Sequence, residues 1–202
     1  MVKIKICGLT SREDAKLALE LGADALGCIC TEQSKRNQSP AQIAAIFRDL
    51  PPFVTRVAVV QNPQPELLAQ LAQCPIDYIQ FHGEEPPQVC ALCPLPWYKA
   101  VKGAAGYTQA LQHYPDSPAL LVDSPAGGGS GRQWDWNGLP APQARTKPLI
   151  LAGGLDPVNL AEAIARIKPW AVDVASGVES SPGMKDPTLL KDFIHNAKLV
   201  GC

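Results

Sequence analysis

The chain has 202 residues, of which 46% are hydrophobic, and 18 basic and 19 acidic residues give it a net charge of −1. This length and composition suit one or two compact domains, and the mixed charges show no basic stripe for nucleic acid. No apolar run approaches the roughly 18 residues of a membrane span, and the start MVKIKICG lacks the apolar stretch of a signal peptide, so we expect a cytoplasmic protein without membrane contact.

Short apolar segments typical of strands alternate along the chain with segments of helical periodicity. The predicted strands are residues 2–7, 23–30, 55–61, 76–83, 97–103, 118–124, 148–154 and 171–177. The predicted helices are residues 11–22, 39–50, 65–74, 86–92, 107–114, 136–145, 157–168 and 186–200. The sixth is a poor helix because it contains two prolines and a glycine.

This alternation determines the predicted fold. Repeated βα units produce parallel strands with helices outside, and eight units suit a closed barrel. The competing architecture is an open doubly wound sheet, which usually carries a glycine-rich turn after its first strand. Here that turn reads Cys7-Gly8-Leu9-Thr10, which does not match. We therefore predict an α/β fold, a single (β/α)₈ TIM barrel domain over residues 1–202.

Three glycine-rich stretches follow strands near the end of the chain. AGGLDP (152–157) and ASGVESSPG (175–183) follow the seventh and eighth strands, where barrels commonly bind a phosphate, and GGGSG (127–131) follows the sixth. Glycine allows the backbone N–H groups to approach an anion closely, and the alternative explanation is ordinary tight turns. The occurrence of two such stretches at the expected places favours the phosphate site. The stretches predict a phosphate site at Gly128, Gly153, Gly154, Ser176 and Gly177.

Cys7 and Asp123 each end a predicted strand, and a barrel site lies at the carboxyl ends of its strands. Alternation places Cys7 on the inner face with Lys5, which together with the nearby helix start is expected to lower the pKa of the thiol. Cys7 is then a candidate base, or else an inert core cysteine. Asp123 is a candidate general acid, or a capping residue for the glycine-rich loop.

Further polar residues are predicted to lie at the same end of the barrel. Asp173 on the neighbouring eighth strand is the expected ion partner of Lys5. His82 is a candidate acid, base or phosphate donor, or a structural histidine. Arg36 in the loop SKRNQ is either a solvated side chain or a ligand for a substrate carboxylate.

The seven cysteines do not indicate a disulfide scaffold, because their number is odd and a chain of this length needs no such links. Cys90 and Cys93 form one CxxC pair, but no second pair or nearby histidine completes a zinc site. We therefore expect no metal.

These motifs, in this order, resemble those of the phosphoribosylanthranilate isomerase family of tryptophan biosynthesis over nearly the whole chain. The resemblance rests on KICGLT, SKR, QFHGEE, LLVDSPAGGGSGRQWDW, LAGGLDPVNL and AVDVASGVESSPGMKD. It implies an Amadori rearrangement of N-(5-phosphoribosyl)anthranilate to 1-(2-carboxyphenylamino)-1-deoxyribulose 5-phosphate. It also implies no metal or organic cofactor, since the substrate nitrogen serves as electron sink, and a phosphorylated small molecule as the partner.

The resemblance also implies roles for particular residues. Asp123 matches the general acid that protonates the ribose ring oxygen, and Cys7 matches the general base that removes the C2 proton. Arg36 matches the residue that holds the anthranilate carboxylate. His82 and Asp173 match residues that line the pocket. The backbone around Gly153, Gly154, Ser176 and Gly177 matches the phosphate site.

At five positions the chain departs from the family pattern. Cys28 and Cys30 stand where phenylalanine is usual, Val60 where an aromatic is common, and Ala152 and Ala175 where serine is frequent. We expect these changes to affect how tightly the aromatic ring is held.

Three alternative functions remain open at this stage. One is another sugar-phosphate isomerase or epimerase on the same fold, of which the metal-dependent epimerases fit poorly because they need several His and Asp ligands. An isomerase that also accepts an aminoaldose of histidine biosynthesis would need a second phosphate site. A non-catalytic barrel that senses a phosphorylated metabolite would need neither Cys7 nor Asp123.

Overall fold

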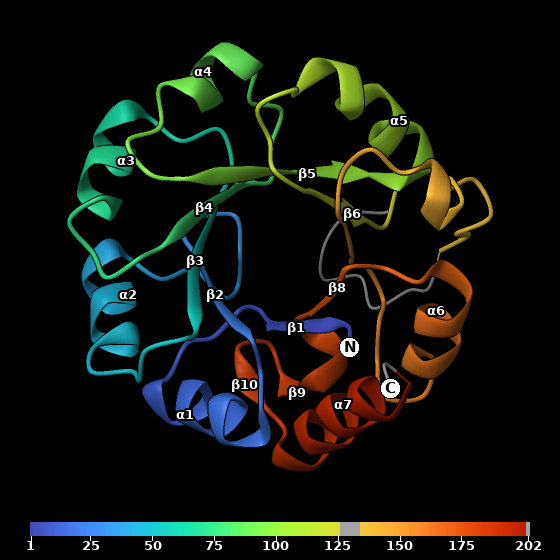
Figure 1. Cartoon of the computed structure of the whole chain (residues 1–202). Helices are drawn as coiled ribbons and strands as arrows, with labels where there is room; N and C mark the ends of the chain where they lie inside the picture. The colour runs from blue at the N-terminus through green and yellow to red at the C-terminus, as the bar shows by residue number, and fades with distance from the viewer. Residues whose placement is uncertain (126–133, 201–202) are drawn as a thin grey trace.

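The structure, a computed structural model, describes residues 1–125 and 134–200, and its strands form a closed barrel surrounded by helices (Figure 1). The barrel strands are β1 (Lys3–Ile6), β2 (Ala25–Ile29), β3 (Thr55–Val60), β4 (Tyr78–Phe81), β5 (Trp97–Lys102), β6 (Leu120–Asp123), β7 (Leu149–Leu151) and β8 (Ala171–Val174). Each pairs in parallel with the next, and β1 pairs in parallel with β8, which closes the barrel. The predicted TIM-barrel fold is therefore confirmed.

Helices follow most of the barrel strands. They are α1 (Arg12–Leu21), α2 (Pro40–Phe47), α3 (Pro65–Leu71), α4 (Pro87–Ala91), α5 (Gly103–His113), α6 (Leu160–Ile167) and α7 (Pro187–Val200). The predicted helix at 136–145 is wrong: this segment contains only the short 3₁₀ helix η1 (Pro142–Ala144). Its prolines lack the N–H groups that a longer helix would need.

Helix boundaries follow local signals in the sequence. The Ser11 side chain accepts a hydrogen bond from the N–H of Asp14 at the start of α1, and Gly22 ends that helix with φ 104°. At α2, Ser39 and Gln42 form a reciprocal capping box, and Pro40 occupies the first turn. These caps satisfy N–H and C=O groups that the helices leave unpaired.

Two apolar layers follow from the alternation of side chains along each strand. Ile4, Ile6 and Val122 belong to the outer layer, which packs between strands and helices. Cys7 and Leu121 belong to a smaller inner cluster within the barrel. The predicted orientations of β1 and β6 are thus confirmed.

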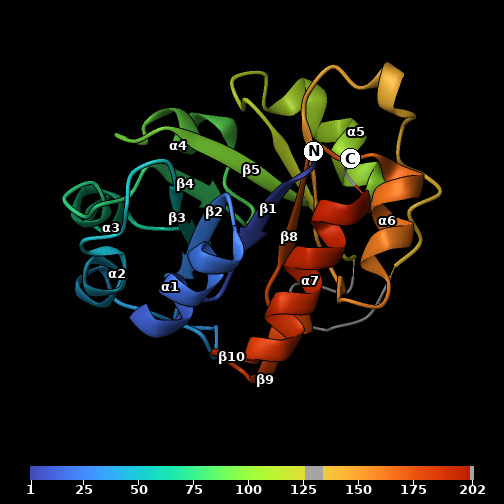
Figure 2. The ribbon, with the colours of Figure 1, turned by 60° about the horizontal axis from the view of Figure 1, so that its bottom comes forward.

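One feature beyond β8 was not predicted. A 3₁₀ turn, η2 (Ser176–Val178), leads into an antiparallel hairpin of β9 (Glu179–Ser181) and β10 (Met184–Lys185). The hairpin lies between α1 and α7 (Figures 1 and 2), and the N–H of Lys185 donates to Asp14 of α1 at 3.1 Å. It therefore reaches back to the start of the chain.

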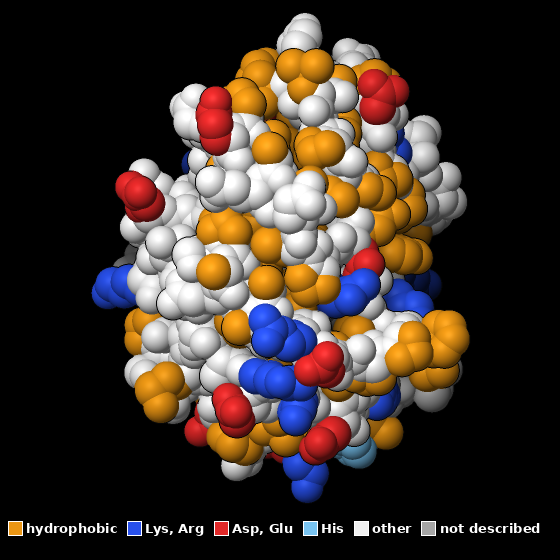
Figure 3. Space-filling view, turned by 90° about the vertical axis from the view of Figure 1, so that its left-hand side faces the viewer, with side chains coloured by type: hydrophobic (Ala, Val, Ile, Leu, Met, Phe, Trp, Pro, Cys, Tyr) orange, Lys and Arg blue, Asp and Glu red, His pale blue; other side chains and the backbone are white. Residues whose placement is uncertain are grey.

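Figure 3 shows one side of the surface, where several Lys and Arg side chains gather in the lower half with Asp and Glu side chains beside them. This mixture agrees with the small net charge. None of the described helices is both long enough and apolar enough to span a membrane.

Candidate active site

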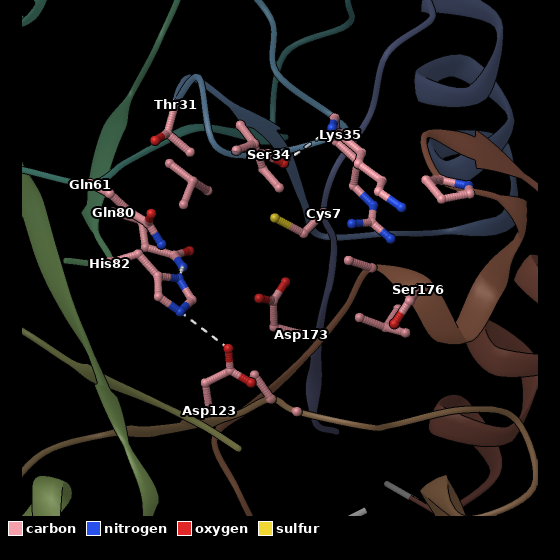
Figure 4. Close-up of a pocket in the computed structure, with 18 of the residues that line it drawn as sticks. Cys7, Thr31, Ser34, Lys35, Gln61, Gln80, His82, Asp123, Asp173 and Ser176 are labelled. Atoms are coloured by element: carbon pink, nitrogen blue, oxygen red, sulfur yellow. Dashed lines mark hydrogen bonds and ion pairs between the residues drawn. The ribbon is translucent and has the colours of Figure 1, made fainter. Parts of the chain in front are cut away.

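A cavity of about 420 Å³ opens at the carboxyl ends of the barrel strands, a size typical of small-molecule sites. Cys7, Arg36, His82, Asp123 and Asp173 all line it, so the structure brings these predicted residues together. Figure 4 shows the thiol of Cys7 and the carboxylates of Asp123 and Asp173 directed into the same space.

Cys7 directly follows β1, which ends at Ile6, and is 5% exposed. A Cβ atom at Gly27 on β2 would lie 2.8 Å from its sulfur, so glycine leaves the space that the thiol occupies. Lys5, one inner position earlier, donates from Nζ to Asp173 at 2.9 Å. The predicted buried ion pair is therefore present beside the thiol.

The predicted lowering of the Cys7 pKa is wrong. Burial raises the pKa of the thiol above its ordinary value, and the negative charge of Asp173 adds to this rise. Lys5 and Lys185 act in the opposite direction but do not outweigh burial. Burial therefore disfavours the thiolate of Cys7, and the two lysines favour it. The sequence suggested a lowered pKa because it places Lys5 beside Cys7, but it does not show how deeply the thiol is buried.

Asp123 lies at the end of a hydrogen-bonded chain on the opposite side of the cavity. The hydroxyl of Tyr98 donates to Oε1 of Gln80 at 2.8 Å, and Nε2 of Gln80 lies 2.8 Å from Nδ1 of His82. Nε2 of His82 lies 3.1 Å from Oδ2 of Asp123. Because the Gln80 amide donates to Nδ1, the proton of neutral His82 is on Nε2 and points at Asp123.

The backbone holds the other oxygen of this carboxylate. The N–H of Ser124 donates to Oδ1 of Asp123 at 2.7 Å. A Cβ atom at Gly153 would lie 2.7 Å from Oδ1 and 2.3 Å from the Ser124 nitrogen. Gly153 also has φ +83°, a conformation that favours glycine. It therefore gives Asp123 the room to sit at the cavity wall.

The predicted phosphate residues fall into three groups. Gly153, Gly154 and Ser176 line the cavity. Gly177 is not among the lining residues, but a Cβ atom there would lie 1.9 Å from the carbonyl oxygen of Leu155, so it allows the loops after β7 and β8 to touch. The remaining prediction, Gly128, lies outside the described residues. The first long helix after Gly154 begins only at Leu160, so the loop rather than a helix terminus faces the cavity.

Arg36 lines the cavity but is already engaged by an acidic residue that the sequence analysis did not assign. Its Nε and Nη2 donate to the carboxylate of Glu179 at 2.6–3.1 Å. The sequence signal for this contact was weak. Glu179 and Lys185 lie in the polar stretch ESSPGMKD, where charged side chains are usually exposed to solvent.

Three of the sequence departures lie away from the cavity. Cys28, Cys30 and Val60 are buried in the outer layer, where they face the helices. Any effect of these three residues on how tightly the aromatic ring is held would therefore be indirect, and that expectation stays a prediction. Ala152 and Ala175 do line the cavity.

No group of three or more His, Cys, Asp or Glu side chains within residues 1–125 and 134–200 is arranged to hold a metal ion. The pairing of Cys90 and Cys93 in the sequence is thus not part of such a cluster in the described residues.

Comparison with known proteins gives one consistent result. The model of the N-(5'-phosphoribosyl)anthranilate isomerase family matches residues 4–196. A curated isomerase of that name from Acidithiobacillus ferrooxidans is 46% identical over 96% of both chains. The phosphoribosyl anthranilate isomerase from Thermus thermophilus superposes with a TM-score of 0.86 at 36% identity, covering 98% of this chain and all of that one.

A further solved isomerase structure is 37% identical, with a TM-score of 0.80 and coverage of 98% of this chain and 99% of the other. It is a complex with reduced 1-(o-carboxyphenylamino)-1-deoxyribulose 5-phosphate. A fold of this kind, a cavity at the expected end of the barrel and a family match over almost the whole length agree with one another. The chain belongs to the N-(5'-phosphoribosyl)anthranilate isomerase family.

Proposed function

We propose that the cavity carries out the reaction for which the family is named, with Asp123 as general acid and Cys7 as general base. The chain is an isomerase of tryptophan biosynthesis by membership of that family. It converts N-(5-phosphoribosyl)anthranilate, an aminoaldose, to 1-(2-carboxyphenylamino)-1-deoxyribulose 5-phosphate, an aminoketose. The observation that carries the residue assignment is the convergence of the Cys7 thiol and the Asp123 carboxylate on a single cavity, where the second carboxylate, Asp173, is already paired with Lys5.

Asp123 begins the reaction by protonating the ring oxygen of the ribose. The C1–O bond breaks, the nitrogen lone pair forms the C1=N bond, and an open-chain Schiff base results. His82 and the Ser124 N–H hold the two carboxylate oxygens, so the acid is fixed in direction before substrate binds. General acid catalysis of this kind contributes on the order of 10²–10⁴-fold to a rate.

Cys7 then removes the proton from C2 of the Schiff base. The electron pair of that C–H bond forms C1=C2, and the electrons of C1=N return to the nitrogen. The resulting enolamine gains a proton at C1 and loses one from the C2 hydroxyl, which gives the ketone. Lys5 and Lys185 stabilise the thiolate that acts in this step against burial and the charge of Asp173.

The rest of the cavity binds the two anionic ends of the substrate. Arg36 is the ligand for the anthranilate carboxylate, since a guanidinium matches a carboxylate in shape and charge. The loops with Gly153, Gly154 and Ser176 are the site for the phosphate, which backbone N–H groups bind well where no side chain intervenes.

The alternative of a non-catalytic metabolite sensor is not favoured, because the chain matches a curated isomerase over 96% of its length. We infer that the enzyme works in the cytoplasm, since its family acts in amino-acid biosynthesis.

The test is turnover of freshly generated phosphoribosylanthranilate by the wild-type protein, followed by the loss of its fluorescence. The account predicts decay well above the uncatalysed rate and a product that borohydride reduces to the analogue with the carboxyphenylamino group. Saturable binding of that reduced analogue without turnover would instead support the sensor.

A further inference from the structure

Lys185 is the most deeply enclosed cation beside the cavity, and the proposed mechanism gives it no contact with substrate. Its side chain is 0% exposed. Its Nζ donates to the carbonyl of Cys7 at 2.6 Å, to the carbonyl of Ala175 at 3.0 Å and to Oε1 of Glu179 at 2.9 Å. One ammonium group therefore joins the end of β1, the end of β8 and the hairpin.

Glu179 extends this contact to the loop that carries Arg36. The side chain of Glu179 is 3% exposed, and it accepts from both Lys185 and Arg36. Burial opposes its ionisation, but the hydrogen bonds and charges of Arg36 and Lys185 outweigh burial and lower the pKa of this carboxyl. Glu179 is therefore a carboxylate between two cations.

The way Glu179 holds Arg36 leaves one edge of the guanidinium for another anion. Glu179 takes Nε and Nη2, and no hydrogen bond within the described residues uses Nη1. A guanidinium has a second fork, formed by Nη1 and the remaining hydrogen of Nη2, which suits a second carboxylate. Lysine has no such fork and would not serve both anions.

Gly8 supplies the space that this arrangement needs. A Cβ atom there would lie 2.6 Å from Cδ of Arg36 and 3.6 Å from Oε1 of Glu179, and Gly8 has φ +73°. The side chains of Arg36 and Glu179 therefore lie against Gly8, the residue directly after Cys7. At Gly8, the side chain proposed to bind the substrate carboxylate is next to the main chain of the proposed base.

We propose that Glu179 and Lys185 are positioning residues: Glu179 aims the outer edge of Arg36 at the substrate carboxylate, and Lys185 fixes the main chain of Cys7 to that pair. This inference rests on the proposed function, because it assumes the roles of Arg36 and Cys7. It adds that the β9–β10 hairpin couples the carboxylate site to the catalytic base.

Several titratable groups surround Cys7, and all of them bear on a titration of its thiol. They are Lys5 on β1, Cys28 on β2, Arg36 in the loop after β2, Tyr98 on β5, Asp173 on β8 and Lys185 on β10. Of these, Lys185 is the cation that also holds the Cys7 carbonyl, so its removal acts on both charge and position.

The first arm of the test measures ligand binding by Glu179→Gln. Calorimetry uses the reduced product analogue and its counterpart without the ring carboxyl group. Loss of a charged anchor for Arg36 is expected to weaken binding of the carboxylate ligand about tenfold, with the other ligand unchanged. KM should rise by a similar factor while kcat stays nearly constant. Equal weakening of both ligands would overturn the proposal.

The second arm measures the pH dependence of Cys7 alkylation by iodoacetamide. Mass spectrometry follows tryptic peptide 6–12, which carries Cys7 as its only cysteine. Lys185→Met should move the midpoint to higher pH and lower kcat, and Lys185→Arg should restore the midpoint toward that of the wild type. An unchanged midpoint in Lys185→Met would overturn the role of Lys185.

Two further variants keep these arms decisive. If Lys185→Met does not fold, Glu179→Gln combined with Lys185→Met removes both charges and gives the same alkylation readout. Asp77→Asn is the matched control, because Asp77 accepts from Nε and Nη2 of Arg56 in the same manner, before β4 begins at the other end of the barrel. It should leave both readouts unchanged. If the wild-type protein shows no turnover, the proposed function is contradicted. If the wild-type protein turns over normally, and Glu179→Gln and Lys185→Met have the ligand binding and alkylation midpoint of wild type, only the present inference is contradicted.

Discussion

The two walls of the cavity hold the two proposed catalytic groups in different ways. On the β1–β8 wall, Cys7 lies among buried charges, with the Lys5–Asp173 pair beside it and Lys185 on its carbonyl. On the β4–β6 wall, Asp123 is held by hydrogen bonds from His82 and from the backbone. Buried charges thus set the environment of the proposed base, whereas hydrogen bonds fix the position of the proposed acid.

The two walls share one feature, a glycine opposite each of these side chains. Each proposed catalytic side chain faces a glycine on the neighbouring strand or loop: Cys7 faces Gly27 and Asp123 faces Gly153. The closed barrel brings the ends of all its strands to one mouth, so both groups reach the same cavity from distant parts of the sequence. Substitutions on the β1–β8 wall should alter the pH dependence of Cys7 alkylation. Substitutions on the β4–β6 wall should lower kcat without changing that pH dependence.

Loss of either proposed catalytic group is expected to have the largest effect, and Asp123→Asn tests the acid. The amide cannot protonate the ring oxygen, so kcat should fall by about 10²–10⁴-fold. Binding of the reduced product analogue, measured by calorimetry, should stay close to that of wild type because the amide keeps the shape of the wall. A variant with near-normal kcat would remove Asp123 as the acid.

Asp173→Asn tests the electrostatic wall. Asp173 raises the pKa of Cys7, and without it Lys5 is no longer neutralised, so the alkylation midpoint of Cys7 should move to lower pH. Thiolate reactivity at neutral pH should rise accordingly. The unpaired buried ammonium should cost about 3–5 kcal/mol of unfolding free energy, measured by denaturant titration. A midpoint at higher pH would show that Asp173 does not raise the pKa of Cys7.

Much of this architecture could be predicted from the sequence, and the exceptions have physical reasons. Strand alternation placed Lys5, Cys7 and Asp173 correctly, because the period of two leaves little choice once a barrel closes. The pKa of Cys7 could not be predicted in this way, since burial depends on residues from several strands.

The hairpin was missed for a related reason. Glu179 and Lys185 look like surface residues in isolation, and only their contacts with Arg36 and Cys7 explain their burial. The assignment of residues 1–202 to a single domain stays a prediction, as do the roles of the site residues.

Gly153→Ala should disturb the acid through its position. The added Cβ atom would meet Oδ1 of Asp123 at 2.7 Å and the Ser124 nitrogen at 2.3 Å, at φ +83°. Strain of this kind costs about 1–3 kcal/mol, and kcat should fall with little change in Cys7 alkylation. Gly106→Ala in α5 is the control, since its nearest contact would be an ordinary 3.4 Å. Equal kcat in the two variants would contradict the assigned role of Gly153.

Gly27→Ala should have the smallest effect. Its Cβ atom would meet the sulfur of Cys7 at 2.8 Å and Nζ of Lys5 at 3.2 Å, but both are side-chain atoms that can shift. Overpacking of this kind costs about 1–3 kcal/mol. We expect a modest fall in kcat, together with a changed pH profile of Cys7 alkylation. A fall in kcat with an unchanged profile would place the damage elsewhere.

The central claim is that Cys7 removes the proton from C2 of the substrate. Its most direct test is the deuterium isotope effect on turnover of substrate labelled at C2 of the ribose, for wild type beside Cys7→Ser. The hydroxyl is a much weaker base, so the account predicts a kcat reduced by about 10²–10⁴-fold and a larger isotope effect, because C–H cleavage then limits the rate. A serine variant with the wild-type kcat and isotope effect would contradict the claim and assign the proton to another group in the cavity.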